Sequence, residues 1–301
     1  MSNRVDNQTV WQKMLGVDRR VIYVIVALVM IIPIIFPFDL PIRVSKRTTQ
    51  TLFDAVEKFP KEHNAMLISA DLSPQDQPEL YPMLVSLLRH SFHRRIKVLA
   101  MCLYANSLGL AEQAFNQVVS EFNNRATTDE ERIIYGRDYV FLGWKPPPIV
   151  PILGLGENIF DVFPKDFYGN DLIQQPMMAN IKSYRDMDMI ASIAANALPI
   201  TYVAYAQARY GIKVTAGVTA VSVADFYPYL DSGQLTGMIE GMKGAAEYEK
   251  LIQEKFSDQE RRMACEGMSA QSTTHIAIIL MVILGNVCYF MQRRHENRRG
   301  V

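Results

Sequence analysis

Acidic, hydroxyl and amide side chains follow several apolar runs that the sequence predicts to be buried strands. Asp71 ends the run 66–71, and Thr219, Ser222 and Asp225 follow the run that begins at Ile212. Carboxylates could act as general acids or bases there, and hydroxyls and amides could orient a ligand. In open α/β sheets, ligands bind at the carboxyl ends of the strands. The residues expected to bind a ligand are Asp71, Ser73, Glu157, Asn196, Thr219, Ser222, Asp225 and Lys243.

Helix capping is the competing interpretation of the acids Asp71, Glu157 and Asp225, and it is favoured for each of them. Lys243 lies in a predicted Gly-Met-Lys-Gly turn at 241–244. Such a turn could present N–H groups and a cation to an anion at a helix N-terminus, although a plain loop is favoured. The aromatic residues at 226–229 either line a pocket or pack in the core. The catalytic residues, if any, stay unknown.

No complete cofactor or metal motif occurs in the sequence. Gly154 and Gly156 form half of a dinucleotide fingerprint, but the third glycine and the following acid are absent. No P-loop and no G-x-S-x-G elbow occurs. His90 and His93 are one helical turn apart, and without further ligands a surface pair is favoured over a metal site. We therefore expect neither a cofactor nor a metal.

Charge and hydropathy predict a membrane protein. The chain has 31 basic and 31 acidic residues, so no overall field would attract nucleic acid. Residues 21–38 and 275–291 are apolar and flanked by arginines, and each is close to the ~20 residues that cross a bilayer. A signal peptide is the alternative for the first segment, and a buried helix for the second. Gly285 and Asn286 predict helix pairing, because glycine allows close approach and asparagine needs a partner.

These features divide the chain into a tail (1–20), a transmembrane helix (21–38), a globular domain (39–274), a second transmembrane helix (275–291) and a basic tail (292–301). Arginines in the last tail favour the cytoplasm, and two spans place both tails on one side. We therefore expect cytoplasmic tails and an extracytoplasmic domain.

The domain is predicted to be α/β, with a mostly parallel, doubly wound, Rossmann-like sheet. Apolar runs and helical spacing alternate along the chain and end in a closing unit, 212–249, with a short strand at 234–239. The predicted strands are 66–71, 96–104, 138–144 and 189–195, and the predicted helices are 48–59, 79–95, 108–122, 157–163 and 199–210.

The run 210–249, with the sequence DYVFLGW at 138–144, resembles a prokaryotic family of membrane-anchored α/β proteins that has no known activity. The order of elements is also similar to the lobes of extracytoplasmic solute-binding proteins, a likeness of fold that carries no residue roles. Two hypotheses follow. The chain is a non-enzymatic binding or assembly subunit of a membrane complex, which pairs with itself or other membrane proteins and takes a small ligand. Alternatively, it is an anchored hydrolase or transferase that uses acids at the strand ends.

Overall fold

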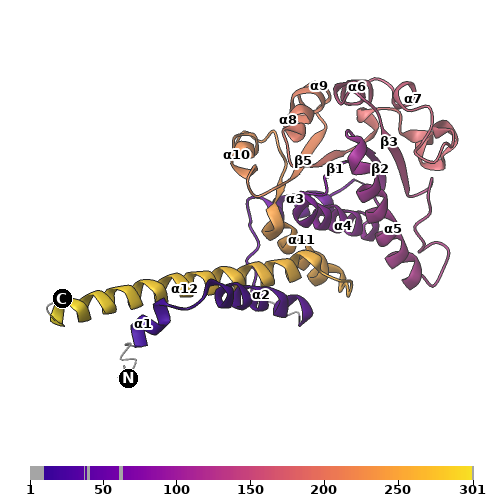
Figure 1. Cartoon of the computed structure of the whole chain (residues 1–301). Coiled ribbons are helices and arrows are strands. Elements are labelled where there is room, and N and C mark those ends of the chain that lie inside the picture. Colours follow the sequence, from indigo (N-terminus) through magenta and orange to yellow (C-terminus); the bar gives the residue numbers. More distant parts are fainter. Residues whose placement is uncertain (1–9, 37, 39–40, 61–63, 300–301) are drawn as a thin grey trace. The chain divides into compact units, whose positions relative to one another are not determined.

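The computed structural model describes residues 10–36, 38, 41–60 and 64–299, and the chain divides into two compact units (Figure 1). One unit is the α/β domain, Pro41–Cys265. The other combines the chain ends, Met1–Leu40 and Glu266–Val301. The first nine residues of the predicted N-terminal tail lie outside the described part.

The domain is built on a six-stranded sheet in the order β3-β2-β1-β4-β5-β6, with every neighbouring pair parallel. The predicted parallel α/β sheet is therefore confirmed. Every residue of β1 and β4 is buried, which explains why both strands appear in the sequence as continuous apolar runs. The strands are Ala65–Asp71 (β1), Lys97–Cys102 (β2), Tyr139–Trp144 (β3), Met189–Ala194 (β4), Lys213–Val218 (β5) and Met238–Glu240 (β6).

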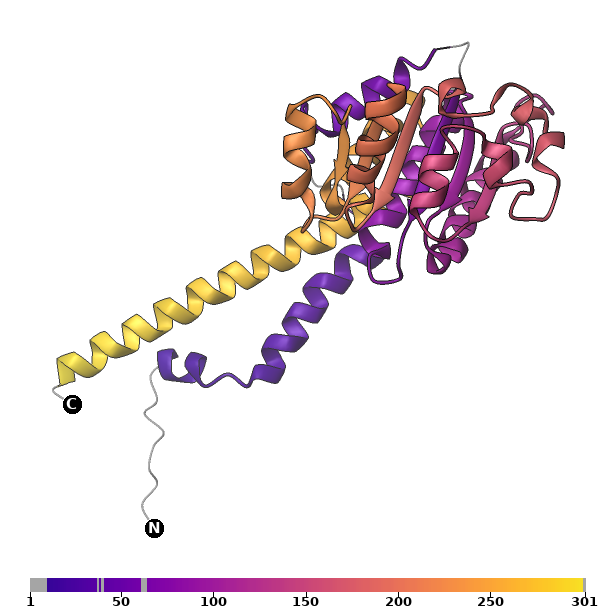
Figure 2. The same ribbon diagram turned by 90° about the horizontal axis from the view of Figure 1, so that it is seen from above.

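The chain winds outward from β1 in one direction and from β4 in the other, so the strand order reverses between these two strands. The crossover helices of the two halves lie on opposite faces of the sheet, whereas α11 (Gly241–Phe256), which follows β6, packs against α4 (Gln77–His93) (Figure 2). One face carries α3 (Thr49–Glu57), α4, α5 (Leu108–Arg125) and α11. The other face carries α6 (Ile149–Gly154), α7 (Ile159–Val162), α8 (Leu198–Tyr202), α9 (Ala208–Tyr210) and α10 (Val223–Asp231).

Three local predictions differ from the structure. The helix expected at 199–210 is α8 and α9 joined by the π-helical stretch Val203–Gln207. The strand expected at 234–239 shortens to β6, and the expected Gly-Met-Lys-Gly turn is the first turn of α11. Gly241 has φ 55°, a conformation that glycine adopts without strain, so the turn from strand to helix is completed in one residue. Single 3-10 turns occur at Ala105–Ser107, Leu172–Gln174, Pro176–Asn180 and Tyr184–Asp186.

The second unit contains α1 (Val10–Leu15), α2 (Arg19–Ile35) and most of α12 (Met263–Arg299). Among the described residues, one helix is long and apolar enough to cross a membrane, at Met263–His295. Helix α2 forms where the first span is predicted, but its 17 residues reach only about 25 Å of a hydrocarbon core about 30 Å thick. The N-terminal span expected at 21–38 therefore stays a prediction.

Candidate functional site

The carboxyl group of Asp71 lies where the strand order reverses, at the end of β1. It is only 4% exposed. Its oxygens accept hydrogen bonds from Ser69 Oγ at 2.6 Å and from the backbone N–H of Leu103 at 2.5 Å. Burial raises the pKa of Asp71 to about 6, although these hydrogen bonds oppose the shift. This carboxyl can therefore exchange a proton near neutral pH in a place that excludes water.

Other buried polar groups lie on the same part of the sheet. Ser69 of β1 is in register with Ser192 of β4, and both are fully buried. The hydroxyls of Ser192 and of fully buried Tyr202 have no hydrogen-bond partner among the described residues. Burial raises the pKa of Tyr202 well above its usual value, and the charge of Asp71 contributes.

Predicted site residues in the loops after β4 and β5 hydrogen-bond within and between these two loops. Asn196 accepts the backbone N–H of Leu198 at 3.0 Å and so orders the turn that leads into α8. Thr219 Oγ1 lies 3.1 Å from Ser222 Oγ, and the Ser222 hydroxyl donates to the carbonyl of Ala195 at 3.3 Å. Asn196, Thr219 and Ser222 therefore border the same edge as Asp71.

Ser73 and Glu79 order the turn after β1. Ser73 Oγ donates to the carboxylate of Asp76 at 2.5 Å. Glu79, in the first turn of α4, accepts the N–H of Ala220 from the loop after β5 at 2.8 Å. The sequence analysis missed Glu79, because its partner is 141 residues away; its only local signal is an acid in the first turn of a helix.

The remaining predicted residues do not join this group. Glu157 accepts from Arg209 and Tyr210, each at 2.8 Å, just before β5 begins, so it lies at the opposite edge of the sheet. Asp225 is exposed in the first turn of α10. Lys243 pairs with Glu247 within α11 at 2.5 Å.

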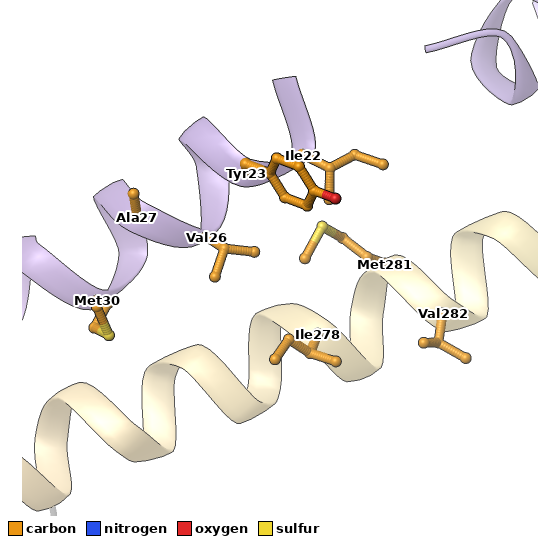
Figure 3. A pocket seen from close by; sticks show the side chains of 8 residues that line it. All are labelled: Ile22, Tyr23, Val26, Ala27, Met30, Ile278, Met281 and Val282. Carbon is orange, nitrogen blue, oxygen red and sulfur yellow. The ribbon is translucent and has the colours of Figure 1, made fainter. Parts of the chain in front are cut away.

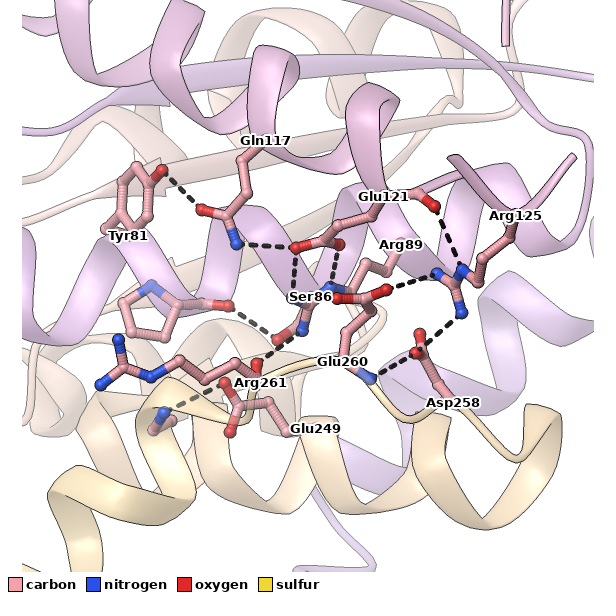
Figure 4. Close-up of polar contacts among 12 residues, drawn as sticks. Tyr81, Ser86, Arg89, Gln117, Glu121, Arg125, Glu249, Asp258, Glu260 and Arg261 are labelled. Atoms are coloured by element: carbon pink, nitrogen blue, oxygen red, sulfur yellow. Dashed lines mark hydrogen bonds and ion pairs between the residues drawn. The ribbon is translucent and has the colours of Figure 1, made fainter. Parts of the chain in front are cut away.

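A second polar cluster surrounds Arg89 on the helical face formed by α4, α5 and α11 (Figure 4). Arg89 makes two bonds to the Glu121 carboxylate, each 2.8 Å, in the paired geometry that suits a guanidinium. It also donates to the carbonyl of Arg261 at 3.0 Å. Arg125 reaches Asp258 at 3.2 Å, so two arginines hold the segment that follows α11.

Glu249 holds the beginning of α12 within the same cluster. Its carboxylate accepts the backbone N–H groups of Ala264 at 3.0 Å and Cys265 at 2.9 Å, as a helix cap would. Burial raises its pKa, and the two hydrogen bonds oppose the rise. Beside it, Arg89 and Asp258 border a cavity of about 10 Å³, close to the volume that one water needs. The first residues of α12, Met263 to Cys265, are thus part of the α/β domain.

The predicted surface pair of histidines is wrong for His90, which is fully buried. Its ring nitrogens lie 2.7 Å from the hydroxyl of Tyr248 and 3.0 Å from Glu57. Neutral imidazole satisfies both groups if Tyr248 donates to Nδ1 and Nε2 donates to Glu57. Burial lowers the pKa of His90 to about 4, so the ring is neutral at physiological pH. Within residues 10–36, 38, 41–60 and 64–299, no group of three or more metal-ligating side chains is assembled.

Comparison with protein-family models and with curated proteins gives no match, so the function is argued from the geometry.

Proposed function

We propose that this chain is a membrane-anchored binding and assembly subunit, held in the bilayer by α12 and associating through that helix. The supporting observation is an exposed amide on an apolar helix. Among the described residues, Asn286 Nδ2 donates only to the carbonyl of Val282 in its own helix, at 2.8 Å, and the side chain is exposed. In hydrocarbon its oxygen would lack a donor, which favours pairing with another membrane helix.

The face that carries Asn286 is suited to such pairing. Helical spacing of three, four and seven residues places Ile279, Ile283 and Phe290 beside it. These three side chains are 57%, 52% and 62% exposed. A partner helix could bury this apolar strip and donate to the amide. The occupant is a second copy or another membrane subunit.

The experiment compares Asn286→Leu with Asn286→Gln in the full chain, extracted in mild detergent and weighed by native mass spectrometry. We expect the wild type to run as an oligomer or a complex. Asn286→Leu should weaken it by about threefold to fivefold, the ~0.6–1 kcal/mol of one interhelical hydrogen bond. Asn286→Gln, which keeps the amide, should restore it. A wild type that is monomeric without companions would overturn the proposal.

We further propose that α2 also enters the bilayer, with both tails cytoplasmic and the α/β domain outside. Arg19 and Arg20 in the first turn of α2, and Arg293 and Arg294 near the end of α12, support this orientation. A protease-cleavable tag inserted beside Asp129, whose side chain is 95% exposed, tests it. We expect protease added outside intact cells to cleave the tag. Cleavage only after lysis would mean that the α/β domain lies in the cytoplasm, which refutes the proposed orientation.

An anchored enzyme is the second candidate, and Asp71 is the observation that favours it. A buried carboxyl with a pKa of about 6 at the reversal of strand order suits general acid-base chemistry. Turnover of ester and phosphoester substrates by the full chain would be measured between pH 5 and 8. Activity lost in Asp71→Asn and kept in Asp225→Asn would support this candidate. Equal activity in the two variants would refute it.

A further inference from the structure

An apolar groove runs between α2 and α12 within the unit formed by the chain ends (Figure 3). Its volume is about 600 Å³, within the ~300–1,000 Å³ range of small-molecule sites. It is lined by Ile22, Tyr23, Val26, Ala27 and Met30 of α2 and by Ile278, Met281 and Val282 of α12.

Two contacts to α12, one from α2 and one from α1, lie on either side of this groove. Toward one end, Thr273 Oγ1 donates to the carbonyl of Val29 at 3.3 Å. Toward the other, Cys288 Sγ of α12 lies 3.9 Å from Met14 Sδ of α1. The space between these two contacts is an open groove with an apolar lining.

Gly285 lies on the groove side of α12. It is three residues after Val282 and four after Met281, so all three share one face of the helix. A Cβ placed on Gly285 would meet no atom within 4 Å. Within the described part of the chain, Gly285 is therefore not used for close packing against α1 or α2.

Two basic residues, Arg19 and Arg20, lie at the N-terminal end of the α2 residues that line the groove. Arg19 is three residues before Ile22 and four before Tyr23, and Arg20 is three before Tyr23 and seven before Ala27. Arg19 is about 4.5 Å along the axis from Ile22. Both arginines are exposed, and the one acid beside them, Asp18, caps α2 by accepting the N–H of Arg20.

From this arrangement we infer that the groove is a binding site for one anionic phospholipid. An acyl chain fills the apolar space between α2 and α12, and the phosphate meets Arg19 and Arg20. Basic residues at the end of a pocket between membrane helices recognise anionic headgroups in this way. The charge at the end of the groove distinguishes this lipid from bulk acyl chains, which would line any apolar helix. The inference rests on the proposed function, since it requires both helices in the bilayer.

Native mass spectrometry of the full chain in detergent, with equal phosphatidylglycerol and phosphatidylcholine, tests the inference. The wild type should retain phosphatidylglycerol preferentially. Replacing both residues, Arg19→Gln and Arg20→Gln, should lower the preference at least about fivefold, the value for one basic residue at a membrane surface. Replacing Arg293→Gln and Arg294→Gln is the matched control and should leave it unchanged.

Ala27→Phe should fill the groove and remove both lipids. Leu28→Trp, at a position 52% exposed that does not line the groove, should not. Equal retention of the two lipids, or an equal effect of both arginine pairs, would overturn the inference. Dissociation of a dimer by Ala27→Phe would also overturn the inference, because a second copy of the chain, and no lipid, would then occupy the groove. Carbonate extraction of membranes separates the two proposals: release of the wild type refutes the anchor, whereas a retained chain without lipid preference refutes only the site.

Discussion

Replacing Asp71 with asparagine should stabilise the domain at neutral pH and leave it unchanged at acidic pH. The asparagine oxygen can still accept from Leu103, and its amide can donate to the hydroxyl of Ser69, so both hydrogen bonds survive. Only the buried charge is lost. The variant therefore isolates the cost of ionising this carboxyl.

The magnitude follows from the pKa of Asp71, raised from 3.8 to about 6. Between these values the native chain holds a proton that the unfolded chain has released. Native stability therefore falls as the pH rises from about 4 to about 6 and is level above that. At about 1.4 kcal/mol per pKa unit, the total loss is about 3 kcal/mol. Asp71→Asn should recover this amount at pH 7.5 and nothing at pH 4.

Urea unfolding of the full chain in detergent, at pH 4 and pH 7.5, would measure the difference between variant and wild type. The wild-type profile alone is not diagnostic, because His90 acts in the opposite direction. Its pKa is lowered to about 4, so its contribution grows as the pH rises from 4 to 6.5. Subtracting the two profiles cancels this term. Asp225→Asn, at an exposed acid, should give no difference at either pH. A constant difference for Asp71→Asn would refute the reasoning.

Two further predictions concern the helices around the sheet. Arg89→Met should lower the free energy of unfolding by about 3 kcal/mol in urea, because the buried carboxylate of Glu121 would lose its cationic partner. Adding Glu121→Leu should restore most of this loss. A double variant that is no more stable than Arg89→Met would contradict this account. Gly241→Ala should lower the free energy of unfolding by about 1–3 kcal/mol in the same assay. Alanine would be strained at φ 55°, and its Cβ would come within 2.9 Å of Ala220 Cβ. Gly169→Ala is the control: Gly169 also has a positive φ but lies in open space, so this variant would show the conformational cost alone.

The sheet could be predicted from the sequence because each parallel strand is a short apolar run, and alternation with helices fixes the class. Asp71 could be found for the same reason, since it ends such a run. The partners of buried polar groups could not be found. His90 is buried only because Glu57 and Tyr248, 33 and 158 residues away, come from other helices. The role of Glu249 could not be predicted either, because an acid within a helix is usually exposed, and its partner at the start of α12 is 15 residues away.

The association and lipid proposals use neighbouring faces of α12, and one substitution on each face separates them. Asn286 shares its face with Ile279 and Ile283, whereas the groove is lined by Ile278, Met281 and Val282, the last of them one turn before Asn286. Asn286→Leu should therefore weaken the oligomer and keep the phosphatidylglycerol preference, and Ala27→Phe should do the reverse. Loss of lipid in Asn286→Leu would mean instead that the groove is completed by a second copy.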